Sequence, residues 1–134
     1  MLIIAILLGA ILGCSSANDG PKTAELPRFL DRYSFKGLRF SYYLIEKDLD
    51  REQLIAVARK IHEEEPDTQL ILVDDESGVD DYIKYAKAVS LGKTDVELPK
   101  AWADKHIVAN LQKFLSGKWM LYKGYGYEEI AAIQ

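Results

Sequence analysis

The stretch Thr68-Gln69-Leu70-Ile71-Leu72-Val73 (residues 68–73) is an almost continuous apolar run that ends at the charges of Asp74-Asp75-Glu76. A strand with one face in water alternates apolar and polar side chains, whereas a strand covered on both faces is apolar throughout. The run therefore predicts a central strand, around which the rest of the fold is organised.

The segments around this run predict a further strand and two helices. Residues 38–45 (LRFSYYLI) favour a strand because β-branched and aromatic side chains suit a pleated surface. Residues 50–53 (DREQ) resemble a capping box, and the helix that follows is closed by Pro66. A second helix is expected to begin near Ser77, which can cap it. The expected inner stripes are Leu54, Val57, Ala58 and Ile61, and then Val79, Tyr82, Ile83 and Ala86.

The last third of the chain is consistent with two structures. Apolar residues at helical spacing, closed by Gly117, fit a helix. Residues 106–115 and 118–123 also fit two strands joined by a tight turn. We favour the hairpin, because Trp119-Met120-Leu121-Tyr122 is a good strand that needs a neighbour. A short final helix is expected at residues 128–131.

Strands and helices that alternate in this way predict one α+β domain over residues 26–134. We expect two layers, with a small mixed or antiparallel sheet packed by two or three helices. The formal net charge of −4 argues against a nucleic-acid partner, which is bound through basic stripes. The same balance gives no polybasic reason for adhesion to anionic lipid.

The first thirteen residues, Met1 to Gly13, are all apolar or glycine. As a helix this run would span roughly 20 Å, against about 30 Å for a bilayer core. Its length suits the apolar region of a secretory signal. The alternatives are a buried N-terminal helix and an uncleaved signal-anchor. Cys14, the only cysteine in the chain, follows directly, so no disulfide framework is expected.

The residues Ile11-Leu12-Gly13-Cys14 resemble the lipobox of bacterial lipoproteins, in which aliphatic and small residues precede a cysteine. The resemblance implies that residues 1–13 are a signal that is cut away and that Cys14 carries a diacylglyceryl group. The new N-terminus would receive a further acyl chain such as palmitate, and two or more chains anchor stably. Residues 14–25 would form a flexible tether. Ser15 resembles the residue that directs such proteins to the outer membrane, facing the periplasm.

Asp74, Asp75 and Glu76, with two further aspartates nearby, are the strongest candidates for chemistry. Carboxylates at the end of a central strand could bind Mg²⁺ or Ca²⁺, or divide acid and base roles. This is the alternative hypothesis of a small metal-dependent hydrolase. The simpler interpretation is that they solvate a loop and favour the positive end of the next helix. No calcium-loop pattern is present, and we expect no cofactor.

The two histidines are weaker candidates. His62 lies near the end of a predicted helix and is expected on the surface, since Pro66 stands where a second zinc-binding histidine would be needed. His106 would need a serine and a carboxylate beside it for nucleophilic catalysis, and no nucleophile-elbow motif occurs.

Aromatic residues near the C-terminus suggest a binding surface, because such side chains are enriched at interfaces and stack on sugars. They are Trp119, Tyr122, Tyr125 and Tyr127. Packing within the core is the simpler interpretation, and Trp119 and Tyr122 cannot share one face of a strand. The sequence therefore favours a lipid-anchored, non-enzymatic binding or structural module, with an envelope protein or glycan as partner.

Overall fold

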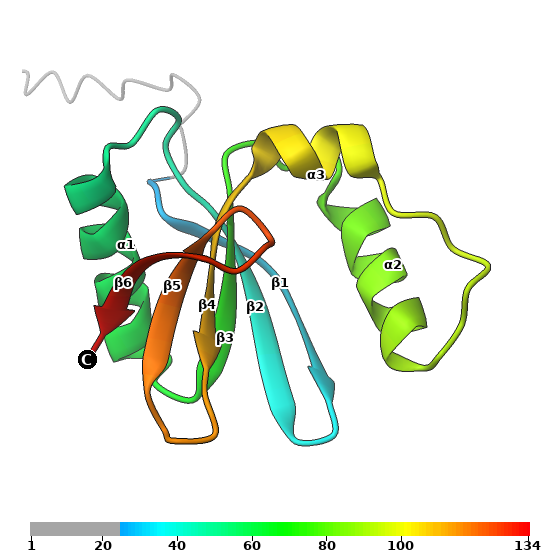
Figure 1. The fold of residues 1–134 in the computed structure, drawn as a ribbon. Coiled ribbons are helices and arrows are strands. Elements are labelled where there is room, and N and C mark those ends of the chain that lie inside the picture. Colours follow the sequence, from blue (N-terminus) through cyan, green and yellow to red (C-terminus); the bar gives the residue numbers. More distant parts are fainter. Residues whose placement is uncertain (1–24) are drawn as a thin grey trace, which may run out of the picture.

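The computed structural model describes residues 25–134, so the predicted signal segment and Cys14 lie outside the described residues. Within residues 25–134 the chain forms six strands and three helices (Figure 1). The strands are β1 (Arg28–Phe35), β2 (Leu38–Leu44), β3 (Thr68–Val73), β4 (Ile107–Lys113), β5 (Trp119–Lys123) and β6 (Glu128–Ile133). The helices are α1 (Arg51–Glu64), α2 (Val79–Ser90) and α3 (Lys100–His106). None of these helices is long and apolar enough to cross a membrane.

All six strands form one sheet, in the order β1-β2-β3-β4-β5-β6. Only β2 and β3 are parallel neighbours, and α1 is the crossover between them. The other pairs are antiparallel. The prediction of a mixed α+β fold is confirmed, although the sheet is larger than expected.

The central strand is β3, and both of its faces are buried. Leu70 and Leu72 pack in a cluster with α1, whereas Val73 packs on the opposite face with α2 and α3. Leu70, Leu72 and Val73 are each 0 % exposed. The predicted two-layer arrangement is therefore wrong: helices cover both faces of the sheet, because the apolar run of β3 must be shielded on both sides (Figure 1).

The start of α1 is confirmed in detail. The Asp50 carboxylate accepts the backbone N–H of Gln53 at 2.8 Å, and the Gln53 side chain accepts the backbone N–H of Asp50 at 2.9 Å. The start of α2 differs from the prediction, because its N-cap is Gly78 and no side chain caps it. The hydroxyl of Ser77 is engaged by Asp75 instead.

In the last third, the hairpin of β4 and β5 is confirmed, and the short helix α3 precedes it. The expected final helix is wrong, because residues 128–133 form β6. Propensity allows a helix here, but β6 pairs with β5, which brings Ile133 opposite Trp119. Tertiary pairing outweighs the local preference.

His62 was expected on the surface, and this prediction is also wrong. Its side chain is 8 % exposed, and its ring lies 4.7 Å from that of Trp119 on β5. Its Nδ1 is buried and has no hydrogen-bond partner among the residues that the structure describes. Burial lowers the pKa of His62, although Asp67 and Glu63 oppose this effect.

We therefore expect acid to destabilise the domain through His62. A histidine of ordinary pKa, about 6.5, takes up a proton in the unfolded chain before it does so in the folded one. Above that pH, neutral His62 adds to the free energy of unfolding. This contribution is lost as the pH falls towards the lower pKa that His62 has in the folded domain. Urea unfolding of the His62→Gln variant should lose less stability between neutral pH and mildly acidic pH than the wild type. Arg59→Gln, on the exposed side of α1, is the control, and an unchanged pH slope in His62→Gln would contradict the assignment.

Candidate functional site

The three carboxylates that follow β3 each have a separate partner. Oδ1 of Asp74 lies 2.7 Å from Nδ1 of His106, at the end of α3. Glu76 forms an ion pair with Arg28 of β1, at 2.7 Å between Oε2 and the guanidinium. Asp75 accepts the backbone N–H of Ser77 at 2.7 Å and its hydroxyl at 2.5 Å. The carboxylates thus join the end of β3 to neighbouring elements and do not converge on one point.

The pKa of Asp75 also argues against a role as a general acid. Hydrogen bonds from the side chain and then the backbone of Ser77 lower the pKa of Asp75 to about 2. A carboxyl group that donates a proton near neutral pH needs a raised pKa. Asp75 is therefore an ionised acceptor across the physiological range.

His106 lies between two of these carboxylates. Its Nδ1 faces Asp74, and its Nε2 is 3.9 Å from Oδ2 of Asp75. A nucleophilic serine would have to donate to the histidine, but the hydroxyl of Ser77 donates to Asp75. Both ring nitrogens thus face carboxylate oxygens, which suits a structural link between α3 and β3. The sequence could not show this pairing, because Asp74 and His106 are 32 residues apart.

The geometry of this region gives little support for a metal site. Among residues 25–134, no three side chains of His, Cys, Asp or Glu gather closely enough to hold a metal ion. The remaining aspartates, Asp80 and Asp81, lie in the first turn of α2, where negative charge stabilises the helix end. This is the simpler interpretation considered from the sequence.

Behind the carboxylates, Trp102 of α3 packs directly onto the backbone at Gly78. A Cβ atom at Gly78 would lie only 2.3 Å from Cδ2 of Trp102. The indole ring of Trp102 also lies 6.1 Å from the His106 ring. α2 and α3 can therefore pack this closely only because the residue at position 78 has no side chain.

Gly78→Ala should destabilise the domain by about 2 kcal/mol, because a rigid indole ring must move to admit the methyl group. The midpoint of urea unfolding measures the effect. Gly126→Ala is the matched control, since its Cβ would lie 4.0 Å from the nearest atom, the carbonyl oxygen of Lys123. Equal stability of the two variants would show that α3 does not pack as described.

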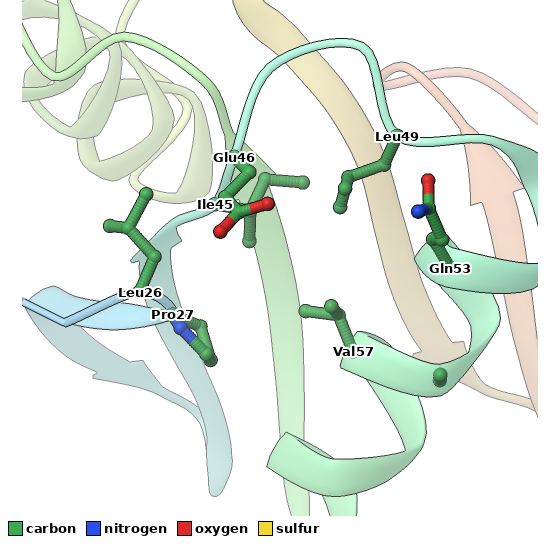
Figure 2. Close-up of a pocket in the computed structure, with 8 residues that line it drawn as sticks. Leu26, Pro27, Ile45, Glu46, Leu49, Gln53 and Val57 are labelled. Carbon is green, nitrogen blue, oxygen red and sulfur yellow. The ribbon is translucent and has the colours of Figure 1, made fainter.

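An apolar groove of about 270 Å³ lies between the start of β1 and α1 (Figure 2). Leu26 and Pro27 form one side, and Leu49 and Val57 form the other. Among residues 25–134, Glu46 is the only ionisable side chain that lines it. The groove therefore has the character of a site for an apolar group and not of a catalytic centre. It adjoins the point at which the described chain begins.

The structure separates the four aromatic residues proposed from the sequence. Trp119 is buried on the α1 face of the sheet, whereas Tyr125 packs in the cluster on the α2 face. Tyr122, which also points away from the α1 face, is buried beside the rings of Phe114 and Tyr127 at centroid distances of 6.2 and 5.8 Å. Tyr127 is 78 % exposed. Tyr125 and Tyr127 therefore remain candidates for one surface, whereas Trp119 and Tyr122 are buried.

The turn that carries Tyr125 is held firmly. Its hydroxyl donates to Asp104 of α3, and this bond raises the pKa of Tyr125. From β4, the side-chain amide of Asn110 donates to the carbonyls of Gly124 and Gly126, at 2.7 and 3.2 Å. The tyrosines are thus presented by a fixed turn.

Tyr125 faces Tyr82 of α2 across a small cleft of about 80 Å³, with 6.5 Å between ring centroids. Gln69 and Gln112 also line this cleft. Sequence reasoning missed both amides and placed Tyr82 only in the core stripe of its helix. Gln69 on β3 and Gln112 on β4 each stand next to buried residues, and this alternation was the available signal for their place in the cleft.

Comparisons with protein-family models, curated proteins and solved structures find no match to this chain.

Proposed function

We propose that this protein is a bacterial envelope lipoprotein whose folded domain is a non-enzymatic binding module. The lipobox-like residues 11–14 support an anchor at Cys14, on the outer membrane facing the periplasm. Residues 14–25 would form the tether, because they are mostly small, polar and turn-forming.

The binding surface that we propose contains Tyr125 and Tyr127, beside the cleft at Tyr82, and the buried ring of Tyr122 packs against Tyr127. The observation that carries this proposal is the exposed ring of Tyr127 and the half-buried ring of Tyr125 on a turn fixed by Asn110, beside a cleft lined by the amides of Gln69 and Gln112. Aromatic rings with amide groups suit a glycan or a polar segment of an envelope protein. Fixed side chains lose little entropy on binding.

The alternative of a metal-dependent hydrolase has less support. Asp74, Asp75 and Glu76 are engaged by His106, Ser77 and Arg28, and an incoming cation would have to break these contacts. Asp75 also lacks the raised pKa of a general acid.

The anchor is tested by Cys14→Ala in the full chain. We expect the variant to fold but to lose membrane attachment that resists high salt, together with incorporation of labelled palmitate, because the thioether cannot form. Membrane fractionation and the intact mass of the protein measure the two effects. Cys14→Ala protein that still sediments with membranes through an intact residue 1–13 segment would favour the uncleaved signal-anchor.

The binding surface is tested with a photo-crosslinking amino acid at Tyr127 of the full chain in intact cells. We expect a discrete crosslinked adduct from this position. The same crosslinker at Arg59, which is exposed on α1, is the control and should give none. Digestion of the adduct with protease or with glycan-cleaving enzymes distinguishes the two classes of partner, and the absence of any adduct at position 127 would refute the proposed surface.

A further inference from the structure

The exposed apolar side chains are unevenly distributed over the described domain. Within residues 25–134, seven large apolar or aromatic residues are exposed, and five of them belong to three short segments. These five are Leu38, Val89, Leu91, Phe114 and Leu115. Single exposed apolar side chains are normal, but a group at one end of a molecule requires an explanation.

The three segments have the same composition. They are Phe35-Lys36-Gly37-Leu38-Arg39 at the β1–β2 turn, Lys113-Phe114-Leu115-Ser116-Gly117-Lys118 at the β4–β5 turn, and Lys87-Ala88-Val89-Ser90-Leu91-Gly92-Lys93 at the end of α2. Each contains two cationic residues, exposed apolar residues and a glycine, and none contains an acidic residue. We call the three together the hairpin end.

The topology brings the three segments to one end of the domain. β2 and β3 are parallel and β4 is antiparallel to them, so the β1–β2 and β4–β5 turns emerge at the same end of the sheet. The end of α2 adjoins the end of β1, where Tyr33, Lys87 and Leu91 line a common hollow of about 190 Å³. In Figure 1 this is the lower end, and β1 begins at the opposite end.

The apolar side chains project as separate tips. Leu115 is fully exposed, Leu91 is 64 % exposed and Leu38 is 49 % exposed. The first tip is a tight turn in which Lys36 and Gly37 both have positive φ, at 48° and 80°. Such a turn matches the twist of its strands and holds the tip in a defined position.

Lysines surround these tips in a regular way. The ammonium group lies above an aromatic ring in three cases, at 5.2 Å for Lys36 over Phe35, 5.7 Å for Lys87 over Tyr33 and 5.8 Å for Lys113 over Trp119. These three lysines are exposed and are held over rings of the domain itself, so their charges lie next to the segments that carry the apolar tips.

Charge is separated along the direction of the strands. The opposite end carries Asp74, Asp75 and Glu76 after β3 and further acidic residues before α1. Acidic residues on the hairpin-end side lie at the end of α1 and before β3, namely Glu63, Glu64, Glu65 and Asp67, and Asp95 follows Lys93 by two residues. Glu65 is paired with Arg32, and both hairpin turns extend past this connection in Figure 1. The hairpin end is therefore cationic, although the whole chain has a net charge of −4.

We propose that the hairpin end docks on a surface of anionic lipid headgroups. The apolar tips would enter the boundary between headgroups and acyl chains, and the surrounding lysines and Arg39 would contact the headgroup charges. A protein interface usually has one continuous, well-packed core. Three separate convex tips with cationic rims fit a deformable bilayer better.

The anchor at Cys14 is compatible with this docking but is not required for it. Residues 14–25 can reach at most about 40 Å when extended, whereas the eight residues of β1 span about 27 Å. A domain tethered at one end can therefore turn its hairpin end towards the same membrane.

The experiment uses the full chain reconstituted in vesicles that contain brominated lipid, a short-range quencher of tryptophan fluorescence. Leu115→Trp reports on the tip, and Lys47→Trp, on an exposed residue at the opposite end, is the matched control. The emission of Trp102 and Trp119 is subtracted with the wild-type protein. We expect the added tryptophan at position 115 to be quenched in phosphatidylglycerol vesicles and several-fold less in phosphatidylcholine vesicles, with little quenching at position 47 in either.

Adding Lys113→Gln and Lys118→Gln to Leu115→Trp should weaken docking by roughly five-fold for each lysine. Lys47→Gln with Lys105→Gln is the control pair in the same Leu115→Trp protein and should change little. Quenching that is equal at positions 115 and 47, or equal in both lipids, overturns the proposal. Shielding of position 115 only in native membranes, and not in protein-free vesicles, assigns the tip to a protein partner and also overturns it.

Discussion

The fold depends on burying both faces of one strand, β3. Leu70 and Leu72 on one face and Val73 on the other are fully removed from water, at roughly 25 cal/mol for each Å² of apolar surface. A sheet that must be shielded on both sides needs helices on both sides, and α1 supplies one layer while α2 and α3 supply the other. Because both faces of the sheet are covered, charged side chains lie at the two ends of the strands. The carboxylates lie at one end and the cationic tips at the other.

Local patterns in the sequence predicted the elements that depend on neighbouring residues. The apolar run of β3, the aromatic strand β2 and the capping box of α1 each carry their signal within a few positions. β6 could not be predicted in this way, because Glu128 to Ile133 is compatible with a helix until β5 is available as a partner. The burial of His62 likewise depends on Trp119, which lies 57 residues later and whose face of the sheet is set by the pairing of β5.

The candidate site was harder to predict than the fold for the same reason. Adjacent carboxylates suggested a shared ligand, but Asp74, Asp75 and Glu76 turn to three different partners, two of them distant in sequence. The cleft beside Tyr125 takes Tyr82 from α2 and Gln112 from β4, which no local pattern associates. Net charge averages over the chain, so it hides a separation of charge that only the topology creates.

The order of the strands in the sheet is the order of the strands in the chain. Each strand after the first therefore finds its partner already synthesised, and most ladders close over a single turn or helix. Such local pairings carry a small loop-closure cost, which favours rapid folding. A polypeptide that emerges N-terminus first, from a ribosome or from a translocation channel, can extend this sheet one strand at a time without waiting for its C-terminus.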